Sequence, residues 1–327
     1  MIASSQMTES EYAITMFQQE ENQKMRTYSF SDDTGDAQIS VDSIAPGIEA
    51  AFVTAHMGNL DFGLFEKAIQ SHYAGIHYCK EGRIEQAIHS EFLYLMPGDC
   101  SITAEDRPSK EFTFPLRHYH GVSIGIDTRK MDAALLAFLS GEGLEPYRII
   151  QNICTAVSTC VVRCQPALQD WFEDLYLAPE DQRAAYLRVK LPELFFLLKH
   201  MDLSASQTEG RMLPRAQVQT AKQVADYITQ HIGEKITLKE LTAHFGVSDT
   251  YLQTVFRTVY GMPVISFIRA QKMQSAAQEL IHSLRSISDI ATEYGYENEG
   301  KFSVAFKKIM GDSPSVYRKE HSKVKIL

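Results

Sequence analysis

The C-terminal third of the chain contains one pattern twice, the second copy about 50 residues after the first. Residues 237–261 have the pattern of a short amphipathic helix, a turn at Gly246 and a second helix that ends at Gly261. Residues 286–311 repeat this order around Gly295 and Gly311. A duplicated helix-turn-helix predicts two helices of the kind that enter a DNA groove.

Matching caps and turns support the duplication. Thr237 and Ser286 are expected N-caps, because each is followed three residues later by an acid, Glu240 or Asp289. Each central glycine stands where the chain needs a positive φ to turn between helices. Two ordinary helical hairpins in an all-α bundle are the alternative. The matched caps, turns and closing glycines favour the helix-turn-helix interpretation.

Residues 263–282 predict one long helix that fixes the two motifs relative to each other. The second copy and its tail run from Gly295 through Phe302, Phe306 and Gly311 to Pro314-Ser-Val-Tyr-Arg318. This segment resembles the AraC/XylS family of transcriptional regulators, and the resemblance covers residues 217–320. It implies a seven-helix unit whose two recognition helices enter successive major grooves of double-stranded DNA, with RNA polymerase as a further partner.

In the first recognition helix, apolar periodicity leaves four polar side chains near the exposed N-terminal half: Asp249, Thr250, Gln253 and Thr254. Gln253 is the candidate for base readout, since a carboxamide pairs bidentately with adenine. Thr250 and Thr254 can offer a hydroxyl to phosphate or a methyl group to thymine. We therefore expect this helix to discriminate between bases.

The second recognition helix presents Glu299, Lys301 and Ser303, with Gly300 and Val304 where the family often has longer polar side chains. We expect it to contribute affinity more than discrimination. The candidate phosphate contacts are Arg257, Lys307, Lys308 and Arg318. For each of these four, an ordinary solvated surface position is the alternative.

The charge is distributed unevenly along the chain. The formal net charge is −9. From residue 217 onward, about 14 Lys and Arg oppose about 11 Asp and Glu, or about +3, which leaves about −12 for the rest. The expected organisation is a polar extension (1–36), an effector-binding and dimerisation domain (37–202), a linker (203–216) and the DNA-binding domain (217–320). We expect a cytoplasmic protein without a signal peptide or membrane partner.

Between residues 39 and 127 the pattern changes to short strands. Alternating apolar and aromatic residues occur in segments 72–78, 91–95 and 121–126, with turns such as Pro97-Gly98-Asp99 between them. This pattern of short strands and turns resembles the cupin-type barrels that precede such DNA-binding units. The expected fold class is α+β, with a small N-terminal cupin-like β-barrel with helices and a C-terminal all-α domain.

The candidate effector residues are His77, Arg117, His118 and His120. A His-x-His pair places both imidazoles on one face of a strand, as a metal site requires. No carboxylate follows at the spacing of cupin metal sites, so we expect these side chains to line an effector pocket, with neither a metal nor a cofactor. If the effector is an anion, Arg117 and the histidines are its natural counter-charges.

Helical periodicity follows in segments 132–138, 167–177 and 181–201. The broad apolar face of the last segment predicts packing on the barrel and a homodimer contact. The expected function is a sequence-specific transcription regulator controlled by a small-molecule effector, and not an enzyme. A metal-dependent cupin-type enzyme fused to a DNA-binding domain is the alternative. A DNA-repair methyltransferase is disfavoured because no Pro-Cys-His-Arg segment is present.

Overall fold

The computed structural model describes residues 25–32, 35–61, 74–88, 91–104, 111–154, 159–163, 165–201 and 212–321. The chain forms two compact units, Met1–Met212 and Leu213–Leu327. The first 24 residues of the expected extension and most of the expected linker lie outside the described residues. The domain bounds expected from the sequence therefore remain predictions.

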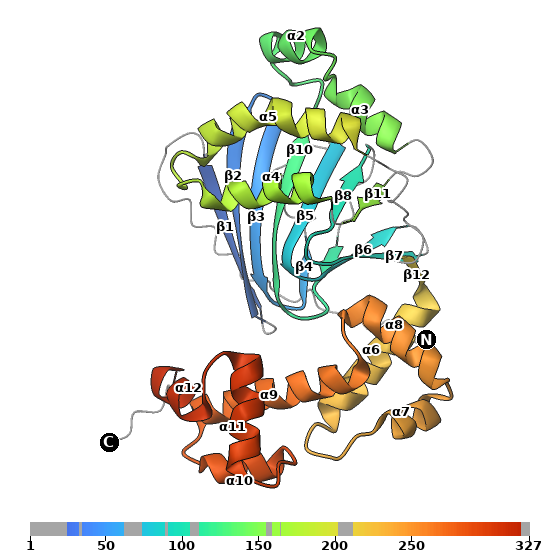
Figure 1. Ribbon diagram of the computed structural model, residues 1–327, viewed down its shortest axis with the longest axis vertical. Helices are drawn as coiled ribbons and strands as arrows, with labels where there is room; N and C mark the ends of the chain where they lie inside the picture. The colour runs from blue at the N-terminus through green and yellow to red at the C-terminus, as the bar shows by residue number, and fades with distance from the viewer. Residues whose placement is uncertain are drawn as a thin grey trace, which may run out of the picture. The chain divides into compact units, whose positions relative to one another are not determined.

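Two antiparallel sheets make up most of the first unit (Figure 1). The described strands of the larger sheet are, in spatial order, β1 (Met25–Asp32), β2 (Gly35–Ala45), β3 (Ile48–His56), β10 (Tyr119–Ile126), β5 (Ala74–Gly82), β8 (Cys100–Thr103) and β11 (Thr159–Val162). Those of the smaller sheet are β12 (Met212–Pro214), β7 (Glu91–Leu95), β6 (Ile84–Ile88), β9 (Glu111–Thr113) and β4 (Asn59–Asp61). The strands expected from segments 72–78, 91–95 and 121–126 are confirmed as β5, β7 and β10.

The turns between strands follow the local sequence. The Pro97-Gly98-Asp99 turn joins β7 to β8, and the amide of Asp99 donates to the carbonyl of Met96 at 2.9 Å. In return the carboxylate of Asp99 accepts from the Met96 amide at 2.9 Å. Gly47 turns β2 into β3 with φ 76°, and a Cβ there would lie 2.5 Å from the carbonyl oxygen of Asp127. Only glycine fits that position without moving the backbone.

The α+β class is confirmed, but the cupin-like closed barrel is not. The hydrogen-bonded ladders of the described strands form two separate sheets, with β1 and β11 at the edges of the larger one. Alternation and turn residues specify where strands begin and end. They do not specify which strands pair across long sequence separations, and closure depends on that pairing.

Helices α4 (Pro166–Leu177) and α5 (Arg183–His200) cross one face of the larger sheet (Figure 1), and they confirm the helices expected at 167–177 and 181–201. Helix α3 (Pro146–Ile153) contacts α5 and β8, and α2 (Ala133–Gly141) precedes it and confirms the helix expected at 132–138. Phe172 of α4 stacks on Tyr78 of β5 with ring centroids 4.7 Å apart. Arg183 Nε donates to the buried carboxylate of Asp42 on β2 at 2.6 Å. Together these contacts hold α4 and α5 on the sheet.

Apart from the end of β12, the described secondary structure of the second unit is helical. Its helices are α6 (Arg215–Gln230), α7 (Leu238–Phe245), α8 (Asp249–Tyr260), α9 (Val264–His282), α10 (Ile287–Glu293), α11 (Glu299–Met310) and α12 (Pro314–His321). The two helix-turn-helix motifs are α7–α8 and α10–α11, and the long helix expected at 263–282 is α9. None of the described helices is long and apolar enough to cross a membrane.

Thr237 tests how far local capping stabilises the first motif. Its side chain accepts from the Glu240 amide at 3.3 Å, and the Glu240 carboxylate accepts from the Thr237 amide at 2.8 Å. We predict that Thr237→Ala destabilises α7 by about 1 kcal/mol, or about fivefold faster amide exchange in the peptide covering α7. Hydrogen exchange of the full-length chain measures this. Thr220→Ala on α6 is the control, because that hydroxyl bonds only the Ala216 carbonyl of its own helix. Equal exchange in both variants would contradict the prediction.

Candidate nucleic-acid interface

The first half of α9 is the platform for the first motif. Val264, Phe267 and Ile268 on α9 are buried, as are Phe256 and Tyr260 on α8. The Phe267 ring lies 5.1 Å from Phe256 and 4.7 Å from Tyr260, centroid to centroid. Aromatic contacts of this kind add to the burial of apolar area and fix the orientation of the partners. The recognition helix α8 therefore has one orientation relative to α9.

The second half of α9 does the same for the second motif. Met273, Ala277 and Leu280 of α9 share a buried cluster with Phe302 and Phe306 of α11. Both phenylalanine side chains are fully buried. A single helix thus packs against both motifs, which lie at its two ends (Figure 1), and α6 adds its buried face to the first motif. Its 19 residues span about 28 Å, comparable with the roughly 34 Å between successive major grooves.

Lys272 connects both motifs to the middle of α9. Its ammonium donates to the carbonyl of Glu234, before the first motif, at 3.1 Å. It also donates to the carbonyl of Tyr294, at the end of α10, at 3.2 Å. Burial lowers the pKa of Lys272. This role was missed from the sequence, because bonds to two distant backbone carbonyls leave no periodic signal.

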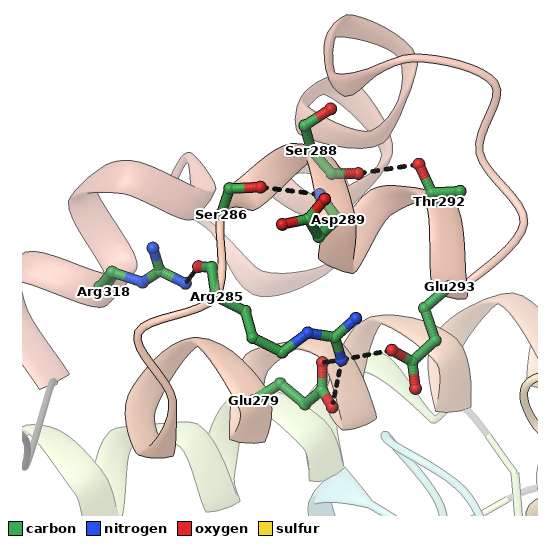
Figure 2. A network of polar contacts seen from close by, with 8 residues as sticks. All are labelled: Glu279, Arg285, Ser286, Ser288, Asp289, Thr292, Glu293 and Arg318. Carbon is green, nitrogen blue, oxygen red and sulfur yellow. Dashed lines mark hydrogen bonds and ion pairs between the residues drawn. The ribbon is translucent and has the colours of Figure 1, made fainter.

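A polar network fixes the start of the second motif (Figure 2). The Arg285 guanidinium donates to the carboxylate of Glu279 on α9 at 3.1 Å and also to Glu293 on α10. Arg318 of α12 donates to the Arg285 carbonyl at 2.6 Å and to the Leu280 carbonyl at 3.2 Å. α9, α10 and α12 are therefore tied together around the loop that precedes α10.

Side chains cap the starts of both recognition helices. The Ser248 hydroxyl accepts from the Tyr251 amide at 3.2 Å, and the Asn298 side chain accepts from the Lys301 amide at 2.8 Å. Gly246 and Gly295 have φ of 65° and 82°, which confirms the positive φ expected at both turns. Thr237 and Ser286 are confirmed as N-caps of α7 and α10.

The exposed face of α8 carries the residues expected to read bases. Thr250, Thr254 and Arg257 are exposed, and Gln253 is half-buried between them. Within the described structure, Gln253 Oε1 is inaccessible to solvent and has no hydrogen-bond partner. An unsatisfied buried acceptor is costly unless a partner arrives. The expected polar face is thus present, but Gln253 Oε1 at its centre accepts no hydrogen bond within the described structure.

The exposed face of α11 differs in charge and in polarity. Glu299, Lys301, Lys307 and Lys308 are exposed, and Ser303 is half-buried. Val304 is 74% exposed at the middle of the helix. The Lys301 ammonium lies 2.6 Å from the carboxylate of Glu297, so its charge is partly neutralised near the helix start. The uncompensated lysines are those at the C-terminal end.

Arg318 belongs to the expected phosphate contacts, but its guanidinium is already engaged with two backbone carbonyls. That structural task was missed from the sequence, as was the role of Arg285. Neither contact has a helical spacing that the sequence could reveal, because Glu279 and Glu293 lie six and eight positions from Arg285.

The candidate effector residues do not form one group. His77 on β5 faces the smaller sheet, where its Nδ1 lies 2.8 Å from the Ser123 hydroxyl and its ring 6.4 Å from that of Phe112. Burial lowers the pKa of His77 to about 4, so this ring is uncharged at neutral pH. A neutral buried ring is no counter-charge for an anion.

His118 and His120 lie on the other face of the larger sheet. Along β10 they alternate with Tyr119, which packs between the two sheets. Their ring centroids are 4.8 Å apart, and Arg117 beside them is exposed. The structure brings His118 and His120 together and separates them from His77.

Comparison with known proteins places the helical unit in a family. A family model for a helix-turn-helix domain matches residues 241–320. The transcriptional activator AarP of Providencia stuartii is 34% identical over 92 residues, which are 28% of this chain and 68% of AarP. The regulatory protein SoxS of Salmonella typhimurium is 33% identical over 100 residues, 31% of this chain and 94% of SoxS. The chain belongs to the AraC/XylS family of transcriptional regulators.

As a member of the AraC/XylS family, the protein is a helix-turn-helix DNA-binding regulator of transcription. The resemblance to this family is confirmed for residues 241–320. The similarity lies in less than a third of the chain. Among solved structures, the C-terminal domain of AraT from Geobacillus stearothermophilus is 29% identical, with a TM-score of 0.32 over 33% of this chain and 90% of that one. A score of that size does not by itself establish a shared arrangement.

Lys272 gives a direct test of how the motifs are held. In Lys272→Met the aliphatic length remains, but the carbonyls of Glu234 and Tyr294 lose their donor. We predict a loss of about 1 kcal/mol in the free energy of unfolding, measured by urea titration of the full-length chain. Lys301→Met is the matched control, since that ammonium is exposed and pairs only with Glu297 among the described residues. A loss no greater than the control's would show that the two bonds contribute nothing.

Proposed function

We propose that the protein recognises a specific DNA site chiefly through α8, holds the duplex through α11, and is controlled by a small molecule acting on the N-terminal unit. The observation that carries the proposal is the polar face of α8, on which Thr250 and Thr254 are exposed beside the half-buried Gln253. In a complex with a duplex, the Gln253 carboxamide would turn outward to the major groove. In this proposal α8 is the reader, which discriminates between bases, and α11 is the clamp, which holds the phosphates.

Base readout needs side chains whose donors and acceptors match base edges. Gln253, flanked by the exposed Thr250 and Thr254, offers a carboxamide donor and acceptor for adenine together with hydroxyl and methyl groups. All three lie in the first half of α8, the part of a recognition helix that meets base edges. Arg257, one turn further on, is placed to contact a phosphate.

The second helix has fewer groups that distinguish bases. Val304 is exposed where a reader would need a polar side chain, and Gly300 has none. Lys307 and Lys308 are exposed in its last turn, and Lys301, Ser303 and Glu299 stand near its start. Ammonium groups on phosphates add affinity that does not depend on sequence. Arg318 also contributes to affinity, because its bonds to two backbone carbonyls hold α12 in place.

Control by an effector is supported by the presence of a separate β-rich unit with its own core. A cupin-like arrangement of its two sheets is part of the proposal. Arg117, His118 and His120 are the candidate residues for this role, because His77 lies on the opposite face of the sheet and burial lowers its pKa to about 4. A compound that changes the retardation of a cognate DNA fragment by the full-length chain would support effector control. Retardation that no tested sugar, organic acid or metal ion alters would count against it.

A homodimer is also part of the proposal. The side chains of Tyr186, Val189 and Phe196 on α5 are exposed and apolar, at 37%, 79% and 53%. Burial of such a face between two copies would place two DNA-binding units on two half-sites and raise affinity through effective concentration. Sedimentation that shows only monomer at micromolar concentration would rule out this arrangement.

We further propose that bound protein activates transcription through contact with RNA polymerase, because the similar protein AarP is a transcriptional activator. A drop in target transcripts on deletion of the gene would support activation, and a rise would indicate repression.

Gln253→Ala tests the reader. We predict a loss of about 1–3 kcal/mol in affinity for the cognate site, with little change on random DNA, because the bidentate base contact is removed. Gel retardation with both fragments at one salt concentration measures this difference. Gln278→Ala, at an exposed position of α9, is the matched control and should change neither affinity. Equal losses on both fragments would mean that Gln253 only positions α8.

Lys307→Ala tests the clamp. We predict a nearly uniform loss of affinity on all sequences and a salt dependence whose slope is smaller by about one, because one phosphate contact is lost. Affinity measured over a series of salt concentrations gives the slope. Lys199→Ala on α5 removes the same charge from the N-terminal unit and serves as the control. An unchanged slope would exclude Lys307 from the phosphate contacts.

A further inference from the structure

Three histidines and one glutamate converge on the helix-covered face of the larger sheet. His56 ends β3, His118 precedes β10, His120 lies within β10 and Glu81 lies in β5. In the strand register His120 is opposite Glu81, and Tyr119 is opposite Ala55, which places His118 beside His56. One ligand nitrogen from each histidine lies within 4.8 Å of the others. We propose that these three histidines bind a divalent transition-metal ion.

The carboxylate of Glu81 determines which nitrogens are free for the ion. Glu81 Oε2 lies 3.3 Å from His118 Nε2 and 3.5 Å from His120 Nδ1. A neutral imidazole has one N–H and one lone pair, so rings that donate to Glu81 keep their lone pairs on the opposite nitrogens. Those are Nδ1 of His118 and Nε2 of His120. A carboxylate that orients ligating histidines in this way is the usual second shell of a metal site.

The two free nitrogens face the third histidine or lack a partner. His118 Nδ1 lies 3.4 Å from His56 Nδ1. This equals the separation of about 3.4 Å between two nitrogens bound at 2.0–2.1 Å to a tetrahedral ion. His120 Nε2 is inaccessible and has no hydrogen-bond partner within the described structure. A cation at the centre would replace the contact between the two Nδ1 atoms and would give His120 Nε2 a partner.

The backbone holds this arrangement in place. Arg117, immediately before His118, has φ of 52° and is the one described residue other than glycine with a positive φ. Its amide donates to the Phe114 carbonyl at 2.8 Å, which closes the turn. Gly82 packs so closely that a Cβ there would lie 1.9 Å from the His118 carbonyl oxygen. Backbone strain of this kind is found where a side chain must be placed for function.

Three imidazole nitrogens select the kind of ion. Nitrogen ligands suit Zn²⁺, Co²⁺, Ni²⁺ and Cu²⁺, whereas Mg²⁺ and Ca²⁺ need oxygen ligands. The side chains of His118 and His120 are 39% and 30% exposed, so an ion can enter from solvent. Three protein ligands leave a fourth position open to water or to a small anion. The bound ion would join β3 to β10, with Glu81 of β5 behind it.

Metal binding by the full-length chain tests the proposal without reference to DNA. Chelator-treated protein is titrated with Co²⁺ and with Zn²⁺, and binding is followed by the visible absorption of Co²⁺, by dialysis and by the melting temperature. We expect one equivalent of ion per chain and a higher melting temperature on loading. Mg²⁺ should do neither. A chain that binds no equivalent of Co²⁺ or Zn²⁺ overturns the proposal.

Four variants locate the ion. His56→Gln and His118→Gln should each abolish stoichiometric binding, because each removes one of three ligands. Glu81→Gln should weaken binding about 10–100-fold, since it removes the charge that orients two ligands. His200→Gln, at an exposed position of α5, should bind like the unaltered chain.

Melting in the presence of chelator shows whether each variant is folded. His56 is exposed and His118 is partly exposed, so their loss should leave the metal-free melting temperature unchanged. Undiminished binding by folded His56→Gln and His118→Gln overturns the proposal. If either of them fails to fold, the affinity of Glu81→Gln decides, and an affinity equal to that of His200→Gln overturns it.

Discussion

The DNA-binding unit depends on the burial of both motifs against one helix. Neither α7–α8 nor α10–α11 is large enough to enclose a core alone, so each borrows apolar surface from α9. Lys272 adds bonds from the middle of α9 to a carbonyl of each half. Because cores are close-packed, the two recognition helices are held at one spacing and cannot adjust independently. The packing of both motifs on α9 therefore sets the spacing between the two recognition helices.

Duplication has not produced two equivalent readers. The caps, turns and core phenylalanines are matched, since each copy must solve the same packing problem. The solvent-facing positions are free of that constraint, and there the copies differ. α8 presents Gln253 with two threonines, while α11 presents Val304 and lysines. Such a regulator would distinguish base sequences mainly in the groove that α8 enters, while contacts in both grooves would contribute to its affinity.

The N-terminal unit shows how sheet topology joins residues that are distant in sequence. His56, Glu81 and His118 belong to three segments, and they meet because β10 pairs with β3 on one side and β5 on the other. The same pairing puts His77 on the opposite face, because side chains alternate along a strand. The absence of a carboxylate at a familiar spacing after His120 argued against a metal, yet Glu81 arrives from a neighbouring strand.

The sequence by itself determined the local features of this protein. N-caps at Thr237 and Ser286, turns at Gly246 and Gly295, the long helix α9 and the alternation of β10 all follow from interactions among residues a few positions apart. Family membership was also readable, because the second motif retains its signature.

Tertiary structure alone decided which strands pair, that the two sheets remain separate, that Arg318 bonds to backbone carbonyls, and that His118 and His120 join His56 rather than His77. These outcomes depend on contacts between residues distant in the chain. Their free energies are set by three-dimensional packing, and no short-range pattern encodes them.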